Sequence, residues 1–105
     1  MKDRMIARIW HGVTHAADAE KYMDYLDHTG LPDYRATPGN QGVTVLRRID
    51  GDVAHFTLIS YWDSLDSIRA FAGDDIQVAR YYPEDEAFLL GKEPHVIHHE
   101  VLVQK

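Results

Sequence analysis

A strand that leads directly into an amphipathic helix, between Phe56 and Phe71, constrains the fold of this chain more than any other feature. Residues 55–62 (HFTLISYW) are rich in the β-branched and aromatic types that favour strands. Both alternating sets of side chains include large apolar groups, as in a strand that is covered on both faces. The pattern therefore predicts a central strand in a sheet whose two faces are both buried.

A capped helix is predicted immediately after this strand. Asp63 or Ser64 can accept a hydrogen bond from the first free backbone N–H groups. Gly73 is suited to end the helix because glycine readily adopts positive φ. The apolar residues between these ends recur at helical spacing, and they are Leu65, Ile68, Phe71 and Ala72. A helix with this apolar stripe packs back onto the sheet to which its strand belongs.

Three further strands are predicted, over residues 5–13, 41–49 and 94–103. The first resembles the central strand in carrying apolar residues on both faces. Asp50-Gly51-Asp52 predicts a hairpin turn from the second strand into the central strand, because Asp-Gly supplies the positive φ angles of a tight turn.

The first crossover is predicted to be helical. Thr14 is a candidate N-cap for a helix that runs to about Asp27, with Gly30 as its stop. Residues 31–39, which end in Pro-Gly, are expected to form a turn or short helix before the second strand.

Two more helical segments are predicted before the last strand. Asp74-Asp75 can cap a segment that carries apolar residues as far as Tyr82, and residues 84–90 can form a short helix. The acidic side chains of Asp74-Asp75 and of residues 84–86 are interpreted as a solvated surface with helix caps.

This order of strand, helix, strand, strand, helix and strand predicts a single α+β domain over residues 1–105 with a ferredoxin-like fold. Right-handed crossovers place both main helices on one face of the antiparallel sheet. The other face would then be bare, although its strands are apolar, and a monomer rarely exposes so large an apolar patch. A two-fold homodimer whose sheets pack face to face is therefore expected.

Composition restricts the partners. The chain of 105 residues has a formal net charge of −6 and lacks the basic patch that nucleic acid or an anionic membrane would require. It has no cysteine, which excludes disulfides, thiolate metal sites and thiol nucleophiles. No apolar run approaches the roughly 18 residues of a membrane span. We expect a soluble cytoplasmic protein that binds neither nucleic acid nor membrane.

The arrangement of elements and the central stretch together resemble the antibiotic biosynthesis monooxygenase superfamily of small dimeric α+β barrels. The resemblance covers essentially the whole chain. It is carried by the strand ending SYWDS, the helix SIRAFAG, and Trp62-Asp63-Ser64 with the aromatic Phe71 nine residues after the Trp. It implies a homodimeric barrel with a small, mostly apolar pocket between helices and sheet, but a shared fold does not identify the reaction.

The chain departs from two functional branches of that superfamily. The branch that oxidises polyketide aromatics to quinones without a cofactor has an Asn and a Tyr where this chain has Leu58 and Ile68, so only Trp62 carries over. In the haem-degrading branch, a Trp and the axial His resemble the positions of Phe71 and Tyr81. The resemblance therefore implies no tightly held cofactor, with haem as an alternative in which a Tyr would replace the usual ligand.

Aromatic residues beside the expected pocket are candidate site residues. Trp62 and Phe71 are expected to line the pocket and contact the substrate. Tyr81 is a catalytic candidate because a phenol near a cavity can bind or deprotonate a phenolic substrate. The alternative for Tyr81 is core or interface packing with its hydroxyl hydrogen-bonded.

The first strand supplies two more candidates. Arg8 and Trp10 share one face, where they could offer a cation and a ring to an anionic aromatic ligand. The alternative for Arg8 is an ion pair at the sheet edge.

His98 on the last strand is the second catalytic candidate, as a group that orients or deprotonates the substrate. A structural role at the pocket or the dimer interface is its alternative. His98 and Glu100 share a face and, with His11 or His55, could form a site with two His and one carboxylate. That spacing is common by chance, so no metal is expected.

Two main hypotheses for function follow. The first is a cofactor-independent monooxygenase that acts on a small aromatic or quinone-type metabolite, in which dioxygen reacts with the substrate anion. The second is a dimer that binds haem or another small apolar ligand without turnover. An accessory or stress-response protein with a filled pocket is a third possibility.

Overall fold

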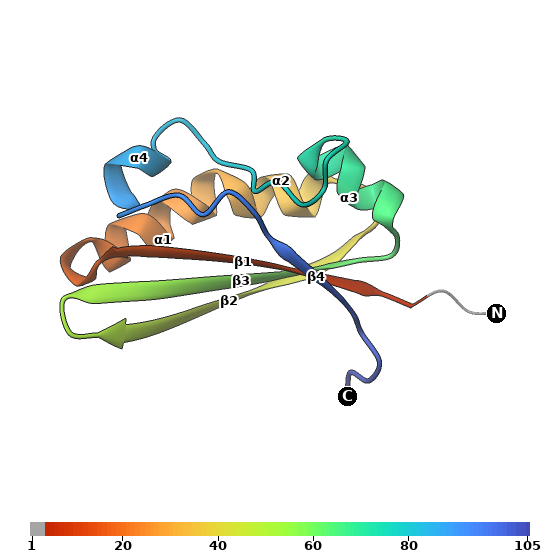
Figure 1. Cartoon of the computed structure of the whole chain (residues 1–105), viewed down its shortest axis with the longest axis horizontal. Helices are drawn as coiled ribbons and strands as arrows, with labels where there is room; N and C mark the ends of the chain where they lie inside the picture. Colours follow the sequence, from red (N-terminus) through yellow and green to blue (C-terminus); the bar gives the residue numbers. More distant parts are fainter. Residues whose placement is uncertain (1–3) are drawn as a thin grey trace.

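A four-stranded antiparallel sheet with helices on one face forms the domain (Figure 1). The computed structural model describes residues 4–105, so residues 1–3 of the predicted domain lie outside the described part. The sheet order is β2-β3-β1-β4, and both β1 and β3 pair antiparallel with their neighbours. This order confirms the predicted ferredoxin-like α+β fold. The strands are β1 (Ile6–His15), β2 (Asn40–Asp50), β3 (Val53–Trp62) and β4 (Ile97–Glu100).

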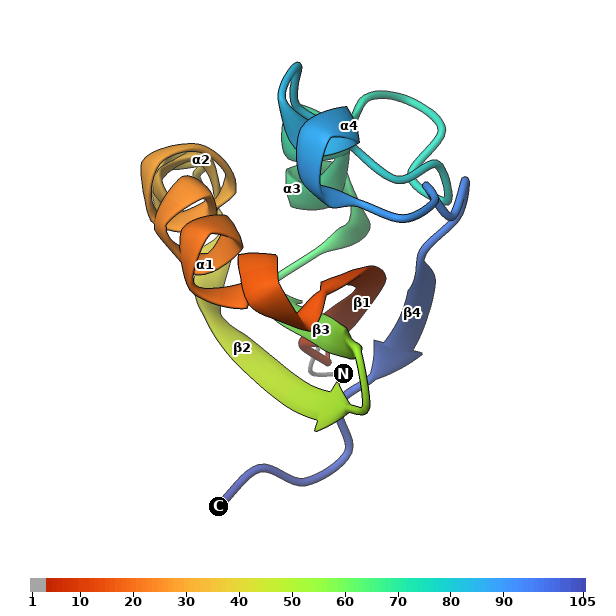
Figure 2. The same cartoon turned by 90° about the vertical axis from the view of Figure 1, so that its left-hand side faces the viewer.

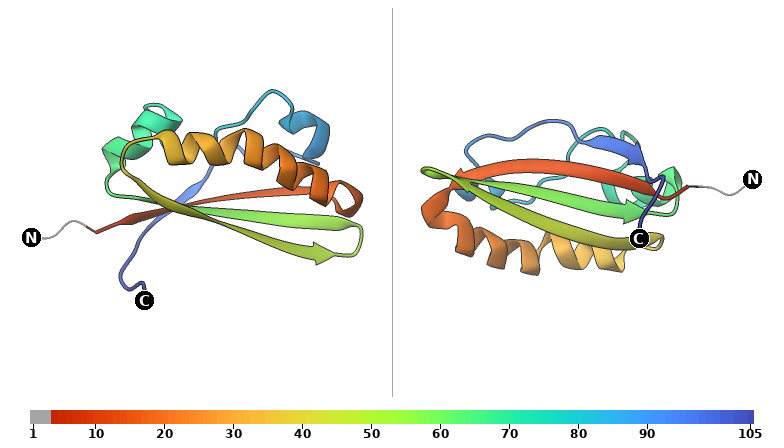
Figure 3. Two further views of the ribbon diagram at one scale, coloured as in Figure 1. Left: turned by 180° about the vertical axis from the view of Figure 1, so that it is seen from behind. Right: turned by 90° about the horizontal axis from the view of Figure 1, so that it is seen from below.

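The helices all lie on the same side of the sheet (Figure 2). None of the helices in residues 4–105 is long and apolar enough to cross a membrane. The opposite side of the sheet is left uncovered, as the view from below shows (Figure 3). The helical elements are η1 (Ala16–Asp18), α1 (Ala19–His28), α2 (Gly30–Ala36), α3 (Leu65–Ala72) and α4 (Asp85–Phe88).

The central strand β3 has one buried face and one partly exposed face. Its side chains alternate strictly between the two states, as period-two geometry requires. The buried side chains face the helices, and they are Ala54, Phe56, Leu58, Ser60 and Trp62. Only one face is therefore covered within the described chain, whereas the sequence predicted cover on both.

Local turn and cap chemistry follows the sequence closely. Of the two predicted caps for α3, Ser64 is the one used: its hydroxyl accepts a hydrogen bond from the backbone N–H of Ser67 at 3.2 Å. Gly73 ends the helix with a φ of 94°. Gly51, with a φ of 60°, lies in the turn between β2 and β3.

The prediction that Thr14 caps the first helix is wrong. Thr14 is a buried residue of β1, paired with Ala54, because the ladder between β1 and β3 continues to His15. The helical region consequently begins at Ala16, and the chain breaks again at Thr29 before α2 starts at Gly30. Gly30 therefore begins the second helix instead of ending the first.

The helix predicted over residues 76–82 does not form. Residues 76–77 form a turn, and the segment pairs with the chain before β4: the N–H of Ala79 donates to the carbonyl of Pro94, and the N–H of Val96 donates to the carbonyl of Gln77. The same pairing shortens the last strand. Residues 94–96 bond to this coil instead of to β1, so β4 covers only part of the predicted 94–103.

Candidate active site

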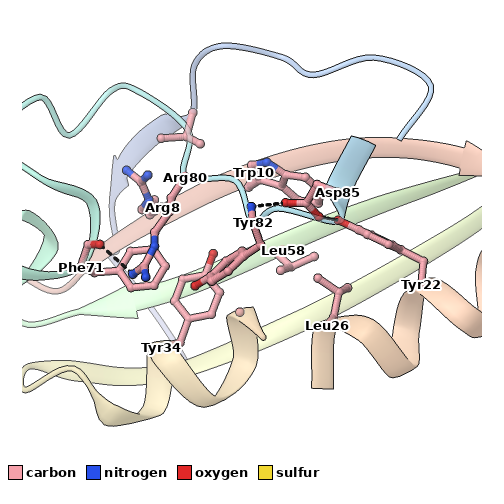
Figure 4. A pocket seen from close by; sticks show the side chains of 12 residues that line it. Arg8, Trp10, Tyr22, Leu26, Tyr34, Leu58, Phe71, Arg80, Tyr82 and Asp85 are labelled. Atoms are coloured by element: carbon pink, nitrogen blue, oxygen red, sulfur yellow. Dashed lines mark hydrogen bonds between the residues drawn. The ribbon is translucent and has the colours of Figure 1, made fainter. Parts of the chain in front are cut away.

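A small cavity lies between the sheet and the layer formed by the helices and the coil of residues 73–84 (Figure 4). Its volume is about 30 Å³, room for one or two water molecules. Five aromatic side chains line it, and they are Trp10, Tyr22, Tyr34, Phe71 and Tyr82. Three charged residues join them, and they are Arg8, Arg80 and Asp85.

Strand β1 positions Arg8 and Trp10 on its helix-facing side, where alternate side chains point inward. The ring of Trp10 lies across Gly12. A Cβ at Gly12 would come within 2.3 Å of Trp10 Cη2, so this strand position requires glycine if the ring is to keep its place. The indole Nε1 of Trp10 is buried and finds no hydrogen-bond acceptor among residues 4–105.

Arg8 is a buried cation with neutral partners. Its side chain is only 2% exposed. Nη1 donates to the carbonyl oxygen of Ile76, Nη2 donates to that of Val78 at 3.1 Å, and Nη1 also lies 3.2 Å from Nε2 of His98. None of the ion pairs formed within residues 4–105 involves Arg8. Burial lowers the pKa of Arg8 from its ordinary value, although arginine stays charged at neutral pH.

Arg80 and Tyr82 come from the coil of residues 73–84 and close the cavity. Arg80 lies over the ring of Phe71, at 4.7 Å from the ring centre, and donates to the Phe71 carbonyl at 3.0 Å. One oxygen of Asp33, on α2, accepts from Arg80 Nη2 at 3.2 Å and from the Tyr82 hydroxyl at 2.7 Å. A single carboxylate thus fastens both covering side chains to α2.

Asp85 is the buried carboxylate at the other end of the cavity (Figure 4). It is 3% exposed, accepts a hydrogen bond from the backbone N–H of Tyr82 at 2.6 Å, and accepts another from the Tyr22 hydroxyl at 3.3 Å. Burial raises the pKa of Asp85, and the two hydrogen bonds oppose that rise. Burial and the nearby Asp85 also raise the pKa of Tyr22. The interpretation of residues 84–86 as solvated is therefore wrong for Asp85.

No protein-family model and no curated protein sequence matches this chain. Solved structures do match over nearly its whole length. A candidate antibiotic biosynthesis monooxygenase from Nitrosomonas europaea gives a TM-score of 0.69 at 13% identity, covering 97% of this chain and 94% of the other. A second candidate, from Bordetella bronchiseptica, gives a TM-score of 0.66 at 19% identity, covering 95% and 99%.

The chain has the antibiotic biosynthesis monooxygenase fold. The resemblance based on Trp62-Asp63-Ser64 and the order of elements is confirmed at this level. A heme-degrading protein from Mycobacterium tuberculosis, solved with two hemes bound in its active site, shares the fold with a TM-score of 0.63 at 18% identity. Here 95% of this chain and 98% of the other are covered. Proteins with this fold therefore include candidate antibiotic biosynthesis monooxygenases and a heme-degrading protein.

Four of the six predicted site residues lie in or directly behind the cavity of this monooxygenase fold. Arg8, Trp10 and Phe71 line it. Trp62 lies one layer deeper: it is fully buried, its ring centre is 5.6 Å from that of Phe71, and its Nε1 donates to Ser60 Oγ at 2.9 Å.

The two predicted catalytic residues lie outside the cavity lining. The Tyr81 hydroxyl donates to the carbonyl of Glu93 at 2.5 Å, and its ring packs edge-on against Trp10, with ring centres 6.2 Å apart. His98 contacts the guanidinium of Arg8. Tyr81 and His98 therefore do not face the cavity, but each contacts a residue that does: Tyr81 contacts Trp10, and His98 contacts Arg8.

Nine lining residues were not predicted as site residues, and five of these are aromatic or charged: Tyr22, Tyr34, Arg80, Tyr82 and Asp85. An inward-facing aromatic residue on a helix has the same sequence pattern whether it fills a core or lines a cavity. Asp85 carried a weak signal, because it closely follows the aromatic pair Tyr81-Tyr82 at the start of a short helix.

The metal cluster considered as an alternative is not assembled in residues 4–105. His98 pairs with Arg8 in the ladder between β4 and β1, so it lies on the helix-facing side of the sheet. His11 and His55 occupy the opposite side, where their rings stack at 5.3 Å. The sheet itself separates the ligands that the cluster would have required.

Haem does not fit the cavity of this fold member in the described conformation. The cavity offers about 30 Å³, whereas ligand sites commonly measure hundreds of cubic ångströms. No histidine lines it, and the hydroxyl of Tyr81 is bonded to Glu93 outside it. Of the tyrosines that do line it, Tyr22 and Tyr82 donate their hydroxyls to Asp85 and Asp33, so neither the usual His nor Tyr81 serves as an axial ligand in the cavity.

Proposed function

We propose that this chain is a cofactor-independent oxygenase that acts on a small phenolic or quinone-type aromatic molecule. The observation that carries this proposal is the buried carboxyl of Asp85, beside the Tyr22 hydroxyl, in a cavity walled by aromatic rings. A carboxylate whose pKa is raised by burial is a stronger base than one in water. The shared fold of candidate monooxygenases supports the same reaction class.

The reaction begins with proton transfer from an activated ring carbon of the substrate to Asp85. The carbanion passes an electron to dioxygen, and recombination forms a C–O bond. The resulting peroxide takes the proton back from Asp85. Loss of water then breaks the O–O bond and leaves a carbonyl, so a CH₂ group and O₂ give C=O and H₂O without an external reductant. The Tyr22 hydroxyl orients the carboxylate through its hydrogen bond.

The polar groups of this site come mainly from outside β3. Leu58 lines the cavity where the quinone-forming branch carries an Asn, so β3 offers no amide there. Asp85 and Tyr22 would supply the polar function instead. Tyr81 and His98, which contact Trp10 and Arg8 from outside, are assigned as positioning residues.

The described conformation is closed, and the substrate requires it to open. A cavity of about 30 Å³ is smaller than an aromatic ring needs. Arg80 and Tyr82 are the side chains whose displacement would enlarge it, because both belong to the coil of residues 73–84 and reach the cavity from above (Figure 4). In the proposed reaction this coil moves as the substrate enters.

The proposal is tested by oxygen consumption with anthrone and 1,8-dihydroxyanthrone as substrates, each of which carries the acidic ring CH₂ group that the reaction requires. Asp85→Asn keeps the size of the side chain but removes its basicity, so the turnover number is expected to fall about 100-fold or more. Glu86→Gln is the matched control, since Glu86 is the exposed neighbouring residue and pairs with Lys92 at the surface. Substrate-dependent uptake that survives in Asp85→Asn, or is absent from the native protein, would reject this mechanism.

A second candidate function is ligand binding without turnover. The observation that favours it is the tight aromatic wall, in which Tyr34 and Phe71 stack with ring centres 4.4 Å apart. Fluorescence changes upon addition of the same aromatic compounds, without oxygen uptake, would support this function over the oxygenase.

The sheet face opposite the helices is proposed to pack against a second copy of the chain. This uncovered sheet face includes Ile9, Leu46, Ile59 and Ile97, of which Leu46 and Ile97 are 48% and 62% exposed. A two-fold partner would bury these apolar side chains against their own counterparts.

A further inference from the structure

We propose that the cavity selects an aromatic molecule that bears an anionic group, and that the guanidinium of Arg8 binds that group. This inference rests on the cavity of the proposed function and specifies its substrate class. Three observations support it: the missing counter-charge of Arg8, the neutral state of its histidine partner, and the separation of opposite charges along the cavity.

The charge of Arg8 is buried without a negative partner among residues 4–105. Its hydrogen bonds go to the carbonyl oxygens of Ile76 and Val78, which carry only partial charge. A buried ion is costly unless an opposite charge compensates it. The other cation of the cavity is compensated, because Arg80 pairs with Asp33 at 3.2 Å. An anionic ligand would complete the site at Arg8.

His98 leaves this positive charge unopposed. Burial and the adjacent Arg8 lower the pKa of His98, so its imidazole is neutral near pH 7. Because the guanidinium can only donate, Nε2 of His98 is the acceptor and the proton resides on Nδ1. The histidine thus holds the guanidinium in place without neutralising it.

The cavity is polarised along its length. Arg8 and Arg80 lie beside Phe71 at one end, and Asp85 and Tyr22 lie at the other (Figure 4). A substrate anion drawn to the arginine end would direct the rest of the molecule towards Asp85. The same polarity disfavours the reversed orientation, because it would bring the anion to a carboxylate.

The test compares benzoate with benzamide, which share size and shape but differ in charge. Tryptophan fluorescence can report binding, since Trp10 lines the cavity. The native protein at pH 7 is expected to bind benzoate at least tenfold more tightly than benzamide. Equal affinity for the two compounds, or no binding of benzoate, would overturn the inference.

Two arginine variants test whether Arg8 causes the preference for benzoate over benzamide. Arg8→Gln is expected to lose the preference for benzoate, whereas Arg69→Gln, an exposed arginine paired with Asp66 on α3, should keep it. A preference that persists in a folded Arg8→Gln, checked by circular dichroism, also overturns the inference. If that variant does not fold, the comparison in the native protein decides. Benzoate selectivity without oxygen uptake from any substrate would reject the oxygenase and leave the anion site standing.

Discussion

The carboxyl group of Asp85 is held in the interior by two donors of different kinds, a backbone N–H and a phenol. The N–H of Tyr82 is fixed by the chain, while the hydroxyl of Tyr22 can turn towards a ligand. Burial raises the pKa of this carboxyl above its unfolded value. Ionisation of Asp85 therefore lowers the free energy of unfolding. The buried base that the proposed reaction requires makes the folded protein less stable.

This gives a pH dependence with a definite sign. Because the folded pKa of Asp85 is raised, its contribution to stability is complete below the unfolded pKa and is lost as the pH rises through the folded pKa. The free energy of unfolding of the native protein should therefore fall relative to Asp85→Asn as the pH rises above about 4, the ordinary pKa of an aspartate. Each unit of raised pKa corresponds to about 1.4 kcal/mol.

Urea unfolding of both proteins across this range measures the difference. Asp74→Asn is the control for the substitution itself, since Asp74 is an exposed aspartate. A difference between the native protein and Asp85→Asn that does not change with pH would show that burial does not raise the pKa of Asp85.

At the scale of elements, strand β1 organises the site. It places Arg8 and Trp10 on the inner face, and Gly12 leaves the space that the indole occupies. The coil of residues 73–84 contributes the opposite wall through Arg80 and Tyr82. One regular strand and one irregular segment thus enclose the cavity between them.

Gly12→Ala tests this arrangement. The new methyl group would overlap Trp10 Cη2, so the indole must move and the free energy of unfolding should fall by about 1–3 kcal/mol. Gly91→Ala is the matched control, because a Cβ at Gly91 meets no atom within 4 Å. Thermal unfolding and tryptophan fluorescence measure the two effects. An unchanged fluorescence spectrum in Gly12→Ala would show that the ring does not depend on this glycine.

The sequence predicts elements well where local chemistry decides them. Ser64 and Gly73 bound α3 as expected, because capping depends on a few adjacent residues. It fails where distant segments compete. The apolar spacing of residues 76–82 is compatible with a helix, but a turn at residues 76–77 and hydrogen bonds with residues 94–96 form in its place. Thr14 likewise pairs with Ala54 of β3, and the residues next to Thr14 in the sequence do not predict this distant pairing.

At the scale of the whole molecule, the helices cover one side of the sheet and leave the other uncovered (Figure 3). The cavity lies on the helical side, opposite the uncovered sheet face. The pairing order fixes this division, since each strand sends alternate side chains to each side. The fold was predictable from the order of elements. The cavity was only partly predictable, because no pattern separates Tyr34, which lines it, from Phe56, which packs in the core.

Leu46→Glu tests the proposed dimer. A charge on the uncovered sheet face should convert a particle of twice the 12.1 kDa chain mass into a monomer, as measured by sedimentation. Leu65→Glu is the control, because Leu65 is 42% exposed on the helical side. A native protein that sediments as a monomer would contradict the proposed dimer.

The two hydrogen bonds that Asp33 accepts affect how fast a ligand can enter and leave the cavity. Because one oxygen of Asp33 accepts from both Arg80 and Tyr82, a movement of the Asp33 carboxylate frees both covering side chains from α2 together. Opening then becomes a single event whose frequency limits how fast any molecule enters or leaves. We expect slow association together with long residence, so that the affinity of a ligand says little about how quickly it exchanges.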